Sequence, residues 1–314
     1  MSSFWLSLIP SAIRLSTPLA LASMGGYFSE RSGVIHIGLE GQMLIGAFAG
    51  AAGNYYFQSP TMGFACAIFA SVCFALMHAV ACIKFRANQV VSGMALNILA
   101  FGVAPLLSFA FFGSTGTTPS IENAVHVKEI AVPLLSDLPY FGGLFGPYTP
   151  LVFFAPIAVI LIHFWTYKTP GGLHFRAVGD HPEAADCQGI YVNKIRYYGV
   201  LMSGVMCGLA GAFLSIEHSA SFSRNMTAGR GYIALTALIF GQWRPIPTLL
   251  ACLLFGFMDA LQIRLQGAEL PGIGAIAPQF IQILPYATAM IVLATFIGKA
   301  SQPKALGKPY YRQE

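Results

Sequence analysis

Charged side chains are scarce in this sequence. Only 9% of its 314 residues are Asp, Glu, Lys or Arg, compared with about 25% in an average soluble protein. Hydrophobic residues make up 56% of the chain, and its mean hydropathy is +0.66. So few charges could not cover a water-soluble globule of this size, which excludes an ordinary cytosolic enzyme, a disordered chain and a disulfide-rich secreted scaffold. The composition predicts an all-α, polytopic membrane helix bundle.

Motifs for catalysis, metal binding and nucleotide binding are also missing. The six Cys form no CxxC pair and the seven His show neither HxxxH nor HExxH spacing, so we expect no metal site. The chain has no GxxxxGK[ST] loop to cradle phosphates. Gly272–Ala277 fits GxGxxA only formally, because no strand precedes it. We therefore expect no enzyme activity and no cofactor in this chain.

The chain contains about nine hydrophobic segments, most of them near the roughly 20 residues that a helix needs to cross a bilayer. Tyr232–Gly241 is too short to span, which predicts a half-helix or broken helix packed inside protein. Ala20-Leu21-Ala22 resembles a signal-peptidase site, but no basic region precedes the apolar run, so we expect a retained first helix. The segments are 4–27, 35–57, 62–83, 89–112, 150–166, 195–216, 232–241, 246–265 and 280–297.

The basic residues orient these segments. Alternation of the segments places four basic groups on one side, which the positive-inside rule makes cytoplasmic. We expect one transmembrane domain over residues 1–298, an external N-terminus, an external loop over 113–148 and a cytoplasmic tail over 299–314. The groups are Lys84 and Arg86, then Lys168, Arg176, Lys194 and Arg196, then Arg244, and finally Lys299, Lys304, Lys308 and Arg312.

The cytoplasmic loop over residues 167–195 is predicted to hold a short helix. Pro182 and Glu183 suit a first helical turn, Asp180 could cap it and Gly189 could end it. Two interpretations follow from the residues alone. The loop could be a solvated connector, or its helix could present small side chains to a cleft on a cytoplasmic partner.

Residues 176–190 resemble the coupling-loop motif of ABC importer permeases of the branched-chain amino acid and ribose type. They read Arg-Ala-Val-Gly-Asp-His-Pro-Glu-Ala-Ala-Asp-Cys-Gln-Gly-Ile. Residues 28–43, 87–97 and 225–235 resemble further segments of that family, and the similarity extends over residues 16–297. The pattern is most similar to the branch that is paired with lipoprotein receptors for purine nucleosides, often described broadly as simple-sugar permeases.

The resemblance implies a bacterial cytoplasmic-membrane subunit that forms half of a pore, commonly as a heterodimer with a second permease. ATP and Mg would be bound by a separate cytoplasmic ABC ATPase, often with two fused ATPase domains. An extracytoplasmic binding lipoprotein would deliver the substrate. No nucleic acid is implied as a partner. The implied ATPase-coupling residues are Arg176, Gly179, Asp180, Pro182, Glu183, Ala184, Ala185 and Gly189.

Polar residues inside apolar segments are the candidates for the substrate pathway, because such groups are costly in a bilayer and usually functional. Glu40 could instead cap a helix or pair with Arg31. Asn97 could bind a neighbouring helix, or a base or ribose hydroxyl. An aromatic ring and an amide before the short segment would suit a nucleoside. The candidates are Glu40, Gln89, Ser92, Asn97, Phe222 and Asn225.

Two GxxxG patterns, Gly46–Gly50 and Gly204–Gly208, predict close helix packing. We expect that packing within the subunit, the other interpretation being a dimer seam.

The sequence therefore predicts a permease subunit that forms half of the pore for a nucleoside, in particular a purine nucleoside. A pentose or other monosaccharide, or a branched-chain amino acid, are alternative substrates. An ion-coupled secondary transporter is the alternative from a different class, although Glu40 and Asp259 offer little material for a relay. With energy supplied by a partner, the permease needs binding differences between two conformations rather than catalytic groups.

Overall fold

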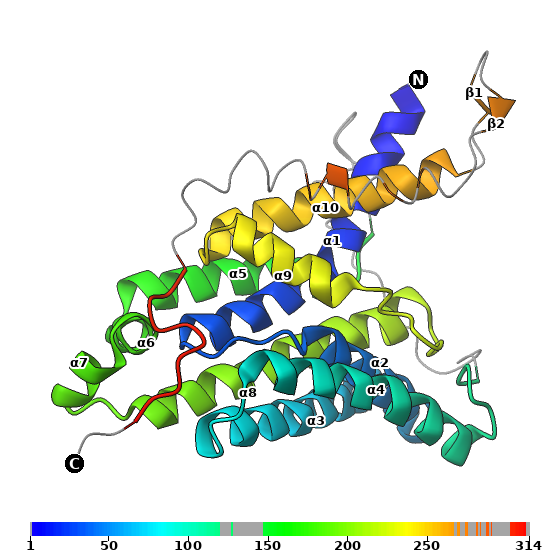
Figure 1. Ribbon diagram of the computed structural model, residues 1–314. Helices are drawn as coiled ribbons and strands as arrows, with labels where there is room; N and C mark the ends of the chain where they lie inside the picture. Colours follow the sequence, from blue (N-terminus) through cyan, green and yellow to red (C-terminus); the bar gives the residue numbers. More distant parts are fainter. Residues whose placement is uncertain are drawn as a thin grey trace.

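The computed structural model describes residues 2–119, 127, 147–266 and 302–311, with short pieces between 269 and 290. The described chain is a helix bundle, as predicted (Figure 1). The strands β1 (Glu269–Leu270) and β2 (Gly274–Ala275) form one antiparallel pair. The helices are α1 (Ser2–Arg31), α2 (Leu39–Phe57), α3 (Pro60–Ala79), η1 (Val80–Lys84), α4 (Gln89–Phe112), α5 (Pro150–Lys168), α6 (Pro170–Asp180), α7 (Pro182–Cys187), α8 (Val192–Ala212), η2 (Phe213–His218), α9 (Arg230–Phe240) and α10 (Pro245–Leu265).

The predicted hydrophobic segments correspond to helices. Five of the described helical segments are long and apolar enough to cross a membrane. Most of the predicted segment 280–297 and most of the loop 113–148 lie outside the described residues. The five spans are Pro60–Lys84, Gln89–Phe112, Pro150–Lys168, Val192–His218 and Pro245–Leu265.

Helices α1 and α2 lie at the centre of the bundle and are buried over most of their described length. Helix α1 packs against α8, α10, α9 and α5 (Figure 1). Helix α8 packs against α2 and α3. The end of the bundle that carries α6 and α7 is called the α7 end below.

Glycines let α8 approach its neighbours closely. A Cβ atom on Gly208 would lie 2.8 Å from Ile68 Cα of α3, and one on Gly46 would lie 3.0 Å from Gly208 Cα. A Cβ atom on Gly204 would lie 2.8 Å from Val72 Cα. The prediction that these glycines pack helices together within the subunit is confirmed.

Two non-helical segments interrupt the bundle. The α1–α2 linker, residues 32–38, is not helical and is buried or half-buried throughout. Helix α2 therefore begins at Leu39 rather than at the predicted Ile35. Residues 219–229 precede α9, which has 11 residues and is therefore about 16 Å long. The prediction of a half-helix for this segment is confirmed, because α9 is too short to cross a bilayer.

Side chains from α3 and α4 satisfy the backbone of the α1–α2 linker. The N–H of Ile35 donates to Gln89 Oε1 at 2.7 Å, and Ile35 O accepts from His78 Nε2 at 3.0 Å. Ile37 O accepts from Asn97 Nδ2 at 3.1 Å. Backbone groups inside a membrane protein need such partners where no helix supplies them. These contacts explain how non-helical backbone can lie inside the bundle.

We expect Gly211→Ala to destabilise the protein by about 1–3 kcal/mol, the usual cost of overpacking. The added Cβ atom would collide with Met43 O and lie 2.6 Å from Ala47 N in α2. Gly102→Ala is the control, because nothing lies within 4 Å of a Cβ atom there. The measurement is the thermal midpoint of the detergent-solubilised protein, and equal midpoints for the two variants would contradict the packing argument.

Candidate functional site

The Glu40 carboxylate joins the beginnings of two helices. Glu40 lies in the first turn of α2 and is 1% exposed. Its Oε1 accepts the Gly229 N–H at 2.8 Å, and its Oε2 accepts the Gly231 N–H at 2.6 Å. Both amides belong to the start of α9, where a helix leaves N–H groups without internal partners and favours negative charge. Glu40 therefore caps α9 from α2.

The close approach at this cap depends on glycine. A Cβ atom on Gly231 would lie 2.5 Å from Glu40 N and 2.6 Å from Glu40 Cα. Gly229 has a φ of 81°, in the left-handed region that glycine adopts without strain. The sequence Gly-Arg-Gly before Tyr232 therefore serves the contact between α2 and α9.

Asn97 connects α4 to the same place. Its Oδ1 accepts the Gly41 N–H at 2.8 Å, and its Nδ2 donates both to Ile37 O and, at 2.9 Å, to Tyr232 Oη. Asn97 is 2% exposed. One amide therefore holds the linker, α2 and α9 together. Direct contact between Asn97 and substrate stays a prediction.

Gln89 and Ser92 lie toward the start of α4 and support the linker. Gln89 accepts from Ile35, as described above, and Ser92 Oγ lies 2.9 Å from His78 Nδ1. Because a carbonyl can only accept, His78 donates through Nε2 and receives the Ser92 hydroxyl at Nδ1. The sequence reasoning did not select His78, although it is a polar residue within an apolar segment and meets the criterion used for the others.

Phe222 and Asn225 line a cavity of about 290 Å³ together with residues of α2 and α4. The Phe222 N–H donates to Thr118 Oγ1 at 2.9 Å, and the ring packs edge-on against Phe48 with centroids 5.4 Å apart. Asn225 is exposed and has a φ of 61°. The cavity is lined by Leu44, Phe101, Pro105, Phe222, Arg224 and Asn225.

This cavity lies one helical turn from Glu40 and from Asn97. Leu44 follows Glu40 by one turn of α2, and Phe101 follows Asn97 by one turn of α4. The predicted pathway residues thus form two neighbouring pairs, and a third pair holds the α1–α2 linker. Glu40 and Asn97 are buried, Phe222 and Asn225 line the cavity with Phe222 fully buried and Asn225 exposed, and Gln89 and Ser92 hold the linker.

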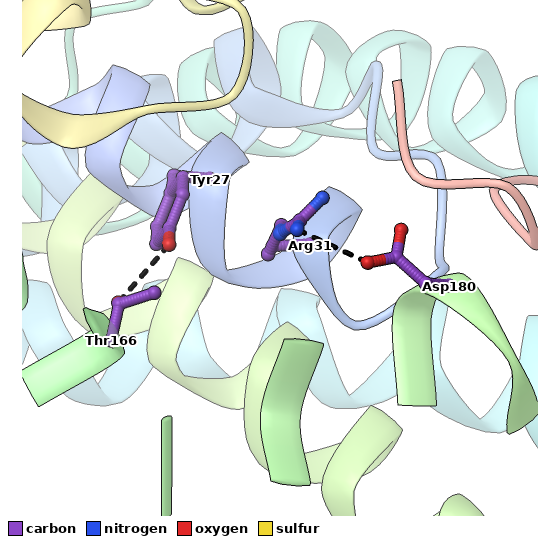
Figure 2. Close-up of polar contacts among 4 residues, drawn as sticks. All are labelled: Tyr27, Arg31, Thr166 and Asp180. Atoms are coloured by element: carbon purple, nitrogen blue, oxygen red, sulfur yellow. Dashed lines mark hydrogen bonds and ion pairs between the residues drawn. The ribbon is translucent and has the colours of Figure 1, made fainter. Parts of the chain in front are cut away.

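The α7 end contains two helices where one was predicted: the predicted short helix is α7, and a second helix, α6, precedes it. Asp180 is the last residue of α6, and its Oδ2 lies 3.2 Å from Arg31 Nη2 (Figure 2). The prediction that Asp180 caps the short helix is wrong, because this ion pair engages its carboxylate. The alternative pairing of Arg31 with Glu40 is wrong, because both carboxylate oxygens of Glu40 accept amides of α9 and Arg31 pairs with Asp180. His181 stands at the N-cap of α7 and makes no capping hydrogen bond through its side chain.

The end of α7 follows the prediction. Gly189 has a φ of 77°, and its N–H donates to Asp186 O at 2.8 Å. A left-handed glycine just beyond the last helical turn is a common helix terminator. The role predicted for Gly189 in ending the helix is confirmed.

The eight residues implied in coupling divide by exposure. Gly179 and Ala185 are buried, the latter against Val178 and Val192. A Cβ atom on Gly179 would collide with Arg31 O, so this glycine lets α6 meet the end of α1. Arg176, Asp180 and Pro182 are half-buried, whereas Glu183, Ala184 and Gly189 are exposed. The exposed face of α7, called the docking face below, consists of His181, Glu183, Ala184, Cys187 and Gln188.

Contacts between α1 and its neighbours fix the α7 end. Tyr27 Oη donates to Thr166 Oγ1 of α5 at 3.0 Å, one turn before Arg31 (Figure 2). Arg176 places its guanidinium over the Tyr167 ring, 4.9 Å from the centroid. The loop is therefore attached to the bundle through both α1 and α5.

Residues 302–311 run alongside the α7 end (Figure 1). The Ala305 N–H donates to Gly179 O at 3.0 Å, and the Gly307 N–H donates to Gly33 O at 3.1 Å. Arg196 Nη1 of α8 donates to Lys308 O at 3.0 Å. The segment thus bridges α6, the α1–α2 linker and α8. A cavity of about 650 Å³ lies between it and residues 180–184.

Comparison with known proteins identifies the chain. The sequence profile of a family described as the permease component of a branched-chain amino acid transport system matches residues 8–297. The chain belongs to this permease family. With the apolar helices above, it is a multi-pass membrane protein.

Several curated relatives cover almost the whole chain. The guanosine ABC transporter permease NupQ of Bacillus subtilis is 40% identical over 97% of this chain and 96% of its own length. The nucleoside permease NupC of Lactococcus lactis is 38% identical over 98% of this chain and 97% of its own length. A Haloferax volcanii permease named for glucose is 35% identical, covering 99% of each. NupP, a second guanosine permease of Bacillus subtilis, is 23% identical over 79% of this chain and 71% of its own length.

A solved structure shares the fold. It is an ABC transporter in an inward-facing conformation, with a TM-score of 0.51 and 15% identity over 93% of this chain and 85% of the other. At this identity the likeness concerns the arrangement of helices.

We expect Glu40→Ala to lower the free energy of unfolding by about 3 kcal/mol, because hydrogen bonds to a charged group contribute about 1.5–3 kcal/mol. The variant leaves the Gly229 and Gly231 amides without their acceptor. Glu40→Gln keeps one acceptor oxygen, so the free energy of unfolding should fall less than in Glu40→Ala. Glu183→Ala, at an exposed position, is the matched control. Thermal midpoints in detergent test this, and a Glu40→Ala protein as stable as the control would refute the cap.

Proposed function

We propose that this chain is one permease subunit of an ABC importer and forms half of the pore for a purine nucleoside. The observation that carries the proposal is the 40% identity to a guanosine permease over 97% of the chain. The nucleoside permease at 38% identity supports the same substrate class. The cavity beside α9 gives this proposal a physical basis.

The cavity offers the groups that recognise a nucleoside. The Phe101 ring is 37% exposed, and base–aromatic stacking contributes about 1–3 kcal/mol per base. The Asn225 amide can both donate to and accept from a base edge, and Arg224 can donate to carbonyl or hydroxyl oxygens. Its volume of about 290 Å³ is near the lower end of small-molecule sites, about 300 Å³. We infer that Phe101 and Asn225 contact the substrate, while Phe222, which is fully buried against Phe48, forms the wall behind them.

The docking face of α7 suits an ATPase partner. Its exposed side chains are small or polar, while Ala185 and Gly179 anchor the helix from behind. We propose that the α7 end faces the cytoplasm, that the N-terminus is external and that the ATPase binds the docking face. ATP and Mg would then be held by that partner.

The second half of the pore would come from a different permease. Bacillus subtilis has two guanosine permeases, and this chain is 40% identical to one and 23% identical to the other. That difference favours a heterodimer in which this chain occupies the NupQ-like position. An extracytoplasmic lipoprotein would deliver the nucleoside to the pair.

We expect Ala184→Trp and Glu183→Arg to abolish co-purification of the ATPase while the permease pair remains in the membrane. Each change places a bulky side chain on the exposed part of α7. Leu173→Trp is the control, because Leu173 is 56% exposed at the same end of the bundle but lies on α6. Normal pull-down of the ATPase by both docking-face variants would refute the proposed contact.

Uptake by whole cells tests the substrate. Cells that express the complete transporter should accumulate labelled guanosine, and cells lacking this chain should not. Excess unlabelled adenosine or inosine should compete, whereas leucine, ribose and glucose should not. Competition by glucose, ribose or leucine in place of nucleosides would replace the proposed substrate class with that of the competitor.

A further inference from the structure

We infer that Tyr232 is a substrate-contacting and specificity-determining residue, and that Asn97 acts as its positioning residue. The inference rests on the proposed function, because it names a side chain that would meet the nucleobase. Neither the apolar pattern nor the motifs singled out Tyr232, which lies in the first turn of α9.

Tyr232 is the open member of an otherwise buried cluster. Its side chain is 43% exposed, whereas Asn97 is 2% exposed and Glu40 is 1% exposed. Asn97 Nδ2 donates to Tyr232 Oη at 2.9 Å. Because Asn97 is also fixed to Gly41 and Ile37, it offers a rigid support for the phenol.

The backbone at Tyr232 is fixed as well. The preceding residue, Gly231, donates its N–H to the Glu40 carboxylate at 2.6 Å. The Tyr232 N–H itself donates to Gly229 O at 3.0 Å. Both ends of the side chain are therefore held, one through Glu40 and the other through Asn97. A binding group held in this way loses little freedom when a ligand arrives.

The depth of Tyr232 in the bundle indicates what its exposed ring faces. Tyr232 is bonded to Asn97 of α4, and α9 runs beside α1 and α10 within the bundle (Figure 1). Tyrosine in membrane proteins gathers where its hydroxyl can reach the water interface. An exposed tyrosine whose hydroxyl is held by a buried amide between helices is better accommodated by a water-filled pathway than by lipid tails. The first turn of α9 therefore lines the route through the subunit.

The chemistry of the exposed ring matches a purine. The phenol presents a flat aromatic face, and its oxygen, which accepts from Asn97, keeps its own hydrogen to donate to a ring nitrogen or ribose oxygen. Phe101, 37% exposed, follows Asn97 by one turn of α4 and lines the neighbouring cavity. A base moving between Tyr232 and that cavity would meet an aromatic surface at each step.

Uptake kinetics in cells that carry the whole transporter test the role of the ring. We expect Tyr232→Leu to raise the KM for guanosine on the order of 10-fold, the effect of losing one stacking contact of about 1.4 kcal/mol. Tyr232→Phe keeps the ring but loses the hydrogen bond to Asn97, so KM should rise less than in Tyr232→Leu. Asn97→Leu should also raise KM, because it releases the phenol from its support. Tyr198→Leu is the matched control, since Tyr198 is 49% exposed on α8.

The split between KM and maximal rate separates recognition from structure. Raised KM with unchanged amounts of assembled transporter, and a smaller rise for Tyr232→Phe than for Tyr232→Leu, support the inference. A lowered maximal rate with unchanged KM, in proportion to a loss of assembled transporter, would overturn it and would assign Tyr232 to packing or to the seam with the second permease.

A labelling experiment keeps this inference separate from the substrate assignment. Tyr232→Cys would be made with Cys66, Cys73 and Cys187, the partly or fully exposed cysteines, replaced by Ser. A membrane-impermeant charged thiol reagent should modify the new cysteine, and the transported substrate should slow this reaction. An unreactive cysteine in an active transporter would overturn the pathway position of Tyr232. Failure of guanosine uptake in the unmodified protein would instead overturn the proposed substrate.

Discussion

The Glu40 carboxylate is the interaction on which the centre of this protein depends. Two helices begin inside the bundle, and each beginning leaves amides without partners. One carboxylate on α2 serves the amides at the start of α9, while the Asn97 amide serves the start of α2 and the linker. Interrupted helices thereby become compatible with a membrane interior. Unwound backbone and half-helix ends of this kind commonly form transport sites.

The helix pattern could be predicted because long apolar segments have few alternative structures in a bilayer. Segment 89–112 was predicted with the bounds that α4 has, and the short segment 232–241 was correctly assigned to a half-helix. The α1–α2 linker was not predicted. Residues 35–38 continue an apolar pattern, and what keeps them out of a helix is hydrogen bonding to side chains of α3 and α4.

The polar positions could be selected from the sequence, but their partners could not. Asn97 was a candidate because it interrupts an apolar segment, yet Tyr232 lies 135 residues away. Asp180 looked like a helix cap from its neighbours, yet Arg31, 149 residues earlier, takes its carboxylate. Local sequence indicates that a polar group in a membrane needs a partner. Which partner it finds is decided by packing between distant helices.

The α7 end and the interrupted helices belong to one connected structure. Arg31 joins the end of α1 to α6, and residues 302–311 join α6 to Gly33 in the linker. The linker is joined in turn to Asn97 and hence to α9. Helices and hydrogen bonds of this kind can carry a movement of one region to another when each has two arrangements. The α7 end is thus connected to the start of α9 by an unbroken series of contacts.

The bond between Ala305 and Gly179 has a consequence for how the protein is made. Ribosomes synthesise residue 305 after all the helices described above, yet its amide completes the contacts of α6, which enters the membrane assembly much earlier. A partly synthesised chain can insert its helices, but its α7 end lacks the 302–311 segment. The contacts of the α7 end are therefore completed only once that segment has left the ribosome.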